Sequence, residues 1–172
     1  KDIVVAADDL EADVPPSSGS KVYNITDAPY RADATGGSMS TDAIQTAIND
    51  AHQAGGGTAY VPEGLFMLDS SIMLKSNVEL YLAGGAVLRS TADPSKFNTF
   101  YHKNSLGDGT WLIYTEGYSE NIKIYGRGTI DGNGFRMKQD HDYYANIVIP
   151  MQCSGFTMDG VVIIDGNMWS VT

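Results

Sequence analysis

The sequence predicts an all-β fold, a parallel β-helix in which coils of about 34 residues stack behind one N-terminal capping helix. Three observations predict it. Short apolar runs alternate with turn-prone residues over most of the chain, one segment repeats internally, and a single amphipathic helix precedes the runs. Strands this short and numerous do not suit a doubly wound sheet, which needs crossover helices.

Size and charge exclude several classes of partner. The chain has 172 residues, 42% of them hydrophobic, which suits one domain with one core. Its 11 basic and 21 acidic side chains give a net charge of −10, which disfavours nucleic acid or an anionic membrane because phosphates would be repelled. The longest apolar runs, such as 145–151, are far shorter than the roughly 20 residues that a transmembrane helix needs. We expect no nucleic-acid partner and no membrane partner.

The sequence offers little support for a metal or redox site. Cys153 is the only cysteine, so there is no disulfide framework, and we expect it to be a buried apolar side chain. His52, His102 and His141 lack the spacing of zinc ligands. We therefore predict no metal and no cofactor.

Residues 1–20 are predicted to form an acidic arm or linker, and residues 21–172 the β-helix domain. The arm ends in two prolines followed by serines and a glycine, a composition typical of exposed linkers. Its acidic residues lack the alternating spacing and turn glycine of a calcium loop, so we interpret them as solvated charge.

A helix is predicted over residues 42–54, where apolar residues recur at positions i, i+3, i+4 and i+7, namely Ile44, Ala47, Ile48 and Ala51. We expect Thr41 or Asp42 to accept the free amide hydrogens of its first turn, and Gln45 to complete a capping box. Glycines 55–57 are expected to end it. This helix would cover the first coil, where core and strand edges would otherwise be open.

Five strands of three to five residues are predicted after the helix, at 58–61, 65–68, 72–74, 78–82 and 86–88. Two more runs, 111–114 and 146–150, each precede one copy of the repeat, in which residues 121–132 align without gaps on residues 155–166. A looser copy occupies 77–88. Three short strands per repeat correspond to one coil of a β-helix. The sequence stops at residue 172 as another strand begins, so we expect further C-terminal coils of the same protein.

Four segments follow one another in a characteristic order, at residues 40–48, 54–64, 74–86 and 126–134. They include Gly-Gly-Gly-Thr-Ala-Tyr-Val-Pro-Glu-Gly and Gly-Arg-Gly-Thr-Ile-Asp-Gly-Asn-Gly. Together they resemble the pectin-lyase-like superfamily, and most of all the polygalacturonase family of glycoside hydrolases, over about residues 22–172. Related dextranase and α-1,3-glucanase β-helix families begin in a similar way. Before the capping helix the family usually has Gly-Asp-Gly-x-x-Asp-Asp-Thr, whereas residues 33–42 of this chain are Asp-Ala-Thr-Gly-Gly-Ser-Met-Ser-Thr-Asp. Of the family's two adjacent aspartates, only Asp42 is present.

The resemblance implies a right-handed β-helix that cleaves polysaccharide in a groove along one face, with inversion by paired aspartates. The family's Asn-Thr-Asp, Asp-Asp, Gly-His-Gly and Arg-Ile-Lys segments are absent, and the family order places them beyond residue 172. We therefore predict no catalytic residue in this chain. We expect a secreted or periplasmic protein with a polysaccharide partner. Two alternatives stay open: a polysaccharide lyase on the same scaffold, and a noncatalytic glycan-binding β-helix such as an adhesin or phage-tail protein.

Asp131 and Asp165 are the carboxylates most easily mistaken for a catalytic pair, because they occupy equivalent repeat positions. Inverting hydrolysis needs carboxyl groups roughly 6.5–9.5 Å apart, whereas stacked strands lie about 4.8 Å apart. Each precedes a glycine at a strand end, where a carboxylate accepts hydrogen bonds from local amides. We interpret both as turn-forming residues.

Sugar contacts are predicted in two stretches without strand patterning, 101–103 and 138–144, which supply aromatic faces and polar groups. The candidate substrate-binding residues are Lys138, His141, Asp142, Tyr143, Tyr144 and Trp169. Packing over the solenoid is the alternative for the aromatic residues. The predicted loop 135–144 and Trp169 both follow an Asp-Gly strand end, so stacking should make them neighbours. Residues 75–138 carry 8 basic and 6 acidic side chains, which favours a uronic-acid substrate but is compatible with a neutral glucan.

Overall fold

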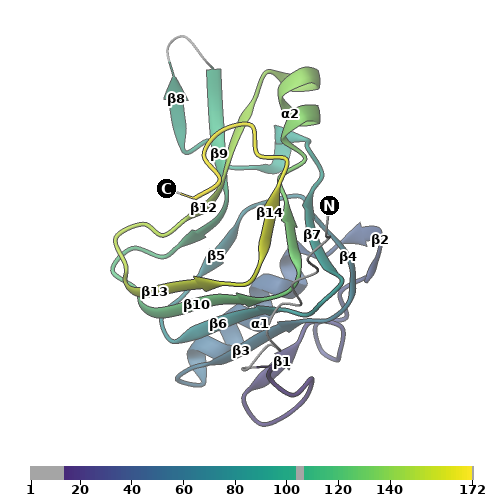
Figure 1. Ribbon diagram of the computed structural model, residues 1–172, viewed down its shortest axis with the longest axis vertical. Helices are drawn as coiled ribbons and strands as arrows, with labels where there is room; N and C mark the ends of the chain where they lie inside the picture. The colour runs from purple at the N-terminus through teal and green to yellow at the C-terminus, as the bar shows by residue number, and fades with distance from the viewer. Residues whose placement is uncertain (1–13, 104–106, 172) are drawn as a thin grey trace, which may run out of the picture.

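The computed structural model describes residues 14–103 and 107–171, and it contains three parallel sheets wound into a solenoid (Figure 1). Sheet A consists of β1 (Val22–Asn24), β3 (Gly57–Val61), β6 (Val78–Leu82), β10 (Glu120–Gly126) and β13 (Ser154–Asp159). Sheet B consists of β2 (Thr35–Met39), β4 (Gly64–Leu68), β7 (Ala86–Ser90), β11 (Thr129–Asp131) and β14 (Val162–Ile164). Sheet C consists of β5 (Ile72–Leu74), β9 (Gly107–Thr115) and β12 (Tyr144–Ile149). The seven predicted strands all coincide with observed ones.

The core is built from columns of inward side chains, to which each coil contributes one residue per sheet. The columns are Ala59, Leu80 and Ile124 in sheet A, Phe66, Leu88 and Ile130 in sheet B, and Ile72, Ile113 and Val148 in sheet C. All of these side chains are buried. Because burial of apolar area contributes about 25 cal/mol per Å², these columns are the main source of stability.

A sharp corner leads from sheet C into sheet A in each coil. Asn77, Asn121 and Gly155 occupy this corner in successive coils with φ of 63°, 54° and 66°. Asparagine and glycine tolerate this left-handed backbone better than other residues. The side-chain amide of Asn121 also donates to Oδ1 of Asn77 at 3.1 Å, so the corner itself is stacked from coil to coil.

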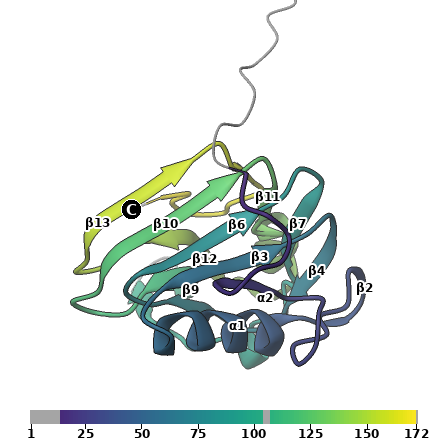
Figure 2. The same cartoon turned by 90° about the horizontal axis from the view of Figure 1, so that it is seen from below.

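Helix α1 (Thr41–Gln53) covers the first coil, as predicted (Figure 2). Its buried face contains the predicted residues Ile44, Ala47, Ile48 and Ala51. The expected capping box is wrong: Ser40 is the N-cap, and no side chain caps the first turn. Gln45 instead bonds to the open edge of sheet C, donating to the Met73 carbonyl at 2.9 Å and accepting from the Met73 amide at 2.8 Å. One side-chain amide thus takes the place of a neighbouring strand.

Insertions enter the solenoid at the corner between sheets B and C. The first follows β7 and contains the short helix η1 (Pro94–Lys96) and β8 (Tyr101–Lys103), which pairs antiparallel with β9. The second follows β11 and contains α2 (Gly134–His141). The prediction of a loop over 135–144 is therefore wrong for most of that stretch. Only Gly134 and Met137 of α2 are buried, so the sequence carries no apolar periodicity that would reveal it.

The gapless repeat holds in sheet A and slips by one residue in sheet B. Ile122 pairs with Phe156 as predicted, but Ile130 pairs with Ile163 rather than Ile164. Asp131 consequently pairs with Ile164, and the predicted equivalence of Asp131 and Asp165 is wrong. Coil length also varies, since Thr58 pairs with Glu79, and Glu79 in turn with Lys123. The repeat of 34 residues describes only the next step in sheet A, in which Lys123 pairs with Thr157.

The N-terminal segment is described only from residue 14, so most of the predicted arm, residues 1–13, lies outside the described residues. Residues 14–20 are largely exposed and run along the outside of sheet A before β1 begins (Figure 2). Cys153, expected to be buried, is half-buried. In the described ranges no helix is long and apolar enough to cross a membrane.

We predict that Gln45→Leu lowers the free energy of unfolding by about 1–3 kcal/mol, because it leaves the Met73 amide and carbonyl without their partner. Gln53→Leu, at an exposed position of the same helix, is the matched control and should change stability little. Urea denaturation measures both. Equal effects of the two substitutions would contradict the role assigned to Gln45.

A second prediction concerns the loop before α1. Hydrogen bonds from the Thr35 hydroxyl and amide, and from Ser38, lower the pKa of Asp33 to about 2. A carboxyl with a depressed folded-state pKa stabilises the fold above its unfolded pKa of about 3.9 and loses that contribution as the pH falls towards 2. Asp33→Asn should therefore lower the melting temperature at pH 6, with a deficit that closes between pH 4 and pH 2. The exposed Asp27→Asn is the control, and a deficit that is independent of pH would count against this account.

Candidate functional site

The outer side of sheet C carries a cluster of three aromatic rings. Phe100, just before β8 in the first insertion, stacks on Trp111 of β9 with ring centroids 4.3 Å apart and an interplanar angle of 6°. Tyr114 of the same strand lies 5.1 Å from Phe100 and 5.8 Å from Trp111. All three side chains are half-buried and lie outside the hydrophobic core. Flat, partly exposed rings of this kind suit the apolar face of a ring-shaped ligand.

The two insertions meet beside this aromatic cluster. The hydroxyl of Tyr143 lies 3.0 Å from the hydroxyl of Thr99, which links the segment after α2 to the segment before β8. Tyr101 packs against Gly109, where any side chain would collide with its ring. Burial, with the neighbouring Tyr143 and Tyr144, raises the pKa of Tyr101 to about 12. The predicted stretches 101–103 and 138–144 therefore do come together.

The polar candidates lie at the end of α2. Lys138 forms an ion pair with Asp142, one helical turn away, and its ammonium lies 4.2 Å from the centre of the Tyr144 ring. The hydrogen bond to Asp142 is the main cause of a raised pKa at Lys138. His141 and Asp142 are exposed, and Asp142 ends the helix in a left-handed conformation. This group presents both signs of charge to solvent.

The aromatic candidates differ in exposure. Tyr143 and Tyr144 are each 8% exposed, so their rings are largely covered, whereas Trp169 is 61% exposed. The contact of all six candidates with a substrate stays a prediction. Burial assigns the two tyrosines a packing role in this chain, and it leaves Trp169 with a free ring surface.

The predicted neighbourhood of the 135–144 stretch and Trp169 is confirmed. Asn167 donates to the carbonyls of Gly134 and Tyr143 at 2.8 and 3.0 Å, and accepts from the Ala145 amide at 2.8 Å. The carbonyl of Trp169 accepts from the Ile147 amide at 3.1 Å. One asparagine thus holds the start and the end of the α2 insertion against the following coil.

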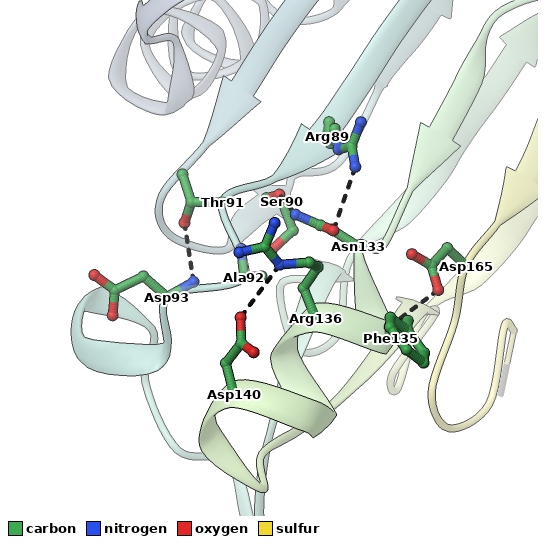
Figure 3. Close-up of polar contacts among 10 residues, drawn as sticks. All are labelled: Arg89, Ser90, Thr91, Ala92, Asp93, Asn133, Phe135, Arg136, Asp140 and Asp165. Atoms are coloured by element: carbon green, nitrogen blue, oxygen red, sulfur yellow. Dashed lines mark hydrogen bonds and ion pairs between the residues drawn. The ribbon is translucent and has the colours of Figure 1, made fainter.

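Asp131 and Asp165 are engaged in local structure, in line with the turn-forming interpretation. Asp131 is buried, lies 3.4 Å from Nε of Arg89 and accepts from the Asn133 amide at 2.9 Å. Asp165 accepts from the amide of Phe135 at 3.0 Å, at the start of α2 (Figure 3).

Asn133 completes this network beside Asp131. It accepts from Arg89 at 3.3 Å and donates to the carbonyl of Ser90 at 3.0 Å (Figure 3). The network fixes the point at which α2 leaves sheet B.

The sequence does not reveal the Phe100–Trp111–Tyr114 cluster, because its pattern marks Trp111 and Tyr114 only as strand residues and Phe100 reaches them by way of the β8–β9 hairpin. Within the described ranges no three His, Cys, Asp or Glu side chains are grouped as metal ligands would be. The prediction that the protein needs no cofactor stays a prediction.

Comparison with known proteins assigns the family. The sequence profile of the family described as rhamnogalacturonase A/epimerase, pectate lyase-like, matches residues 22–171. Mannuronan C5-epimerase AlgE1 of Azotobacter vinelandii is 32% identical over 140 residues, covering 76% of this chain and 9% of the relative. The exo-poly-α-D-galacturonosidase of Dickeya chrysanthemi is 33% identical over 130 residues, covering 70% of this chain and 21% of the relative.

Among solved structures, the exopolygalacturonase of Thermotoga maritima superposes with a TM-score of 0.71 at 22% identity, over 88% of this chain and 43% of that chain. The right-handed parallel β-helix and the resemblance to the pectin-lyase-like superfamily are both confirmed. The chain spans only 7–21% of the length of the curated relatives that it matches. The chain belongs to the rhamnogalacturonase A/epimerase, pectate lyase-like family.

Proposed function

We propose that the protein containing this chain is a polysaccharide-degrading glycoside hydrolase that acts on a uronic-acid polymer along the outer side of sheet C. The observation that carries this proposal is the family match over residues 22–171, which includes all the described strands. Such polymers lie outside the cytoplasm, so we also propose a secreted or periplasmic location.

The names of the relatives support the substrate class. One relative is named for mannuronan and another for poly-α-D-galacturonate, and both names refer to uronic-acid polymers. Lys138, over the ring of Tyr144, and the exposed His141, both in the last turns of α2, supply cationic or hydrogen-bonding groups for a carboxylate. Because Asp142 already pairs with Lys138, a uronate would compete with it for the ammonium.

The six candidate residues divide into two roles under this proposal. Lys138, His141, Asp142 and Trp169 would contact the polymer, because they are the candidates that solvent reaches. Tyr143 and Tyr144 would hold the two insertions together. Trp111 and Phe100 join the contact set as a stacked pair on which a sugar ring could lie.

Hydrolysis with inversion would use paired aspartates beyond residue 172. Asp131 and Asp165 are poor candidates, because the first faces Arg89 and the second bonds to the start of α2. This chain's residues would bind and orient the polymer, while the proton donor and the base would come from further coils.

The reaction class is tested on the complete protein with polygalacturonate, alginate and dextran as substrates. We expect new reducing ends from a uronate polymer, without the ultraviolet absorbance of unsaturated products. Absorbance of that kind would establish a lyase, and a change in C5 configuration without cleavage, measured by NMR, would establish an epimerase. Binding without any chemical change would support the noncatalytic alternative and overturn the proposal.

Burial predicts different outcomes for two aromatic substitutions. Trp169→Ala should raise KM about tenfold and shift stability by no more than about 0.5 kcal/mol, because an exposed stacking surface of about 1–1.5 kcal/mol is lost. Tyr144→Ala should lower the free energy of unfolding by roughly 3–5 kcal/mol, because it empties a buried site. Initial rates and thermal melts of both variants measure this. If Trp169→Ala leaves KM unchanged, its ring is not part of the binding surface.

A further inference from the structure

A cavity of about 450 Å³ lies on the outer side of sheet A, on a different face of the solenoid from the aromatic cluster of sheet C. Residues 15–22 form one side of it, and the starts of β3, β6 and β10, with the corner residue Asn77 just before β6, form the other. This volume is within the range of about 300–1,000 Å³ that small-molecule sites occupy. The proposed activity does not use this cavity.

The first group that marks the cavity as a binding site is the carboxylate of Glu79. Its Oε2 atom accepts the hydroxyl of Thr58 at 3.1 Å and the hydroxyl of Tyr125 at 2.9 Å. Both hydrogen bonds fall on the same oxygen. Within the described ranges no donor reaches Oε1, so one acceptor of a positioned carboxylate is left for a ligand.

The corner asparagines supply the second group. Asn77 and Asn121 line the cavity, both are exposed, and a single hydrogen bond of 3.1 Å joins Nδ2 of Asn121 to Oδ1 of Asn77. In the described part of the chain, the other amide atoms of this pair, the NH₂ of Asn77 and Oδ1 of Asn121, have no side-chain hydrogen bond. A donor and an acceptor therefore stand side by side, as the adjacent hydroxyls of a sugar require.

Apolar surface and balanced charge complete the lining. Pro15, Pro16 and Val22 provide aliphatic faces, against which the C–H face of a pyranose ring can pack. Lys21 carries the positive charge that offsets Glu79. A lining with one charge of each sign favours a neutral ligand, because the Glu79 carboxylate would repel a uronate.

We infer that this cavity is a second, noncatalytic site for a neutral oligosaccharide, in which Glu79, Asn77 and Asn121 bond to hydroxyls and the two prolines cover one ring. This inference goes beyond the proposed activity. The sheet A site would hold the protein on a neutral glycan while the outer side of sheet C acts on a charged one.

The test measures binding of cellotetraose to the complete protein by isothermal titration calorimetry. We expect saturable binding that Asn121→Ala and Lys21→Met each weaken at least fivefold, with thermal melts showing that both variants are folded. Trp111→Ala, in the aromatic cluster of sheet C, is the control and should leave this binding unchanged. Uronate hydrolysis should be unaffected by Asn121→Ala, so the two proposals fail independently.

Two results would overturn the inference. One is the absence of cellotetraose binding by the unmodified protein. The other is binding that Trp111→Ala abolishes while Asn121→Ala leaves it intact, which would place the sugar on sheet C.

Discussion

The register between successive coils is the constraint on which the rest of this structure depends. Each parallel strand bonds to the strand one coil earlier, and each inward residue stacks on its counterpart, as Leu80 does between Ala59 and Ile124. A slip of one residue would turn apolar side chains outward along the whole strand. The stack also needs a first layer, and α1 provides it with an apolar face and with the amide of Gln45, which bonds to β5 as a strand would.

This constraint decides where the molecule can vary. Strands and inward residues are fixed by their neighbours, but a corner can lengthen without disturbing the stack. Both insertions therefore enter between sheets B and C, where they lie together because the coils that carry them are adjacent (Figure 1). The candidate site is a consequence of this arrangement. The Tyr143 hydroxyl contacts that of Thr99, one coil earlier, and the Phe100 ring stacks on Trp111 across the β8–β9 hairpin. The residues that we propose to bind polysaccharide lie in the corners and on the outer faces, whereas the inward columns supply most of the stability.

Local periodicity explains what could be predicted from the sequence. The strands and α1 were predictable because each has its own apolar pattern, and the position of Trp169 beside the α2 segment followed from stacking alone. The rest depends on contacts between distant residues. Helix α2 buries only Met137 as a large side chain, so it has no periodic signal. The bond from Gln45 to β5 replaced a local cap that its spacing suggested, and the one-residue slip at Ile130 arises in a corner whose length the repeat alone does not set. The burial of Tyr143 and Tyr144 depends on the first insertion, which the sequence does not place.

We propose that polysaccharide lies along the outer side of sheet C, over the rings of Phe100 and Trp111 and beside Trp169. A crystal structure of the complete protein with a hexasaccharide of its substrate tests this most directly. We expect sugar rings stacked on Trp111 or Trp169, with a carboxylate near Lys138. Sugar density confined to the outer side of sheet B, away from these residues, would contradict it.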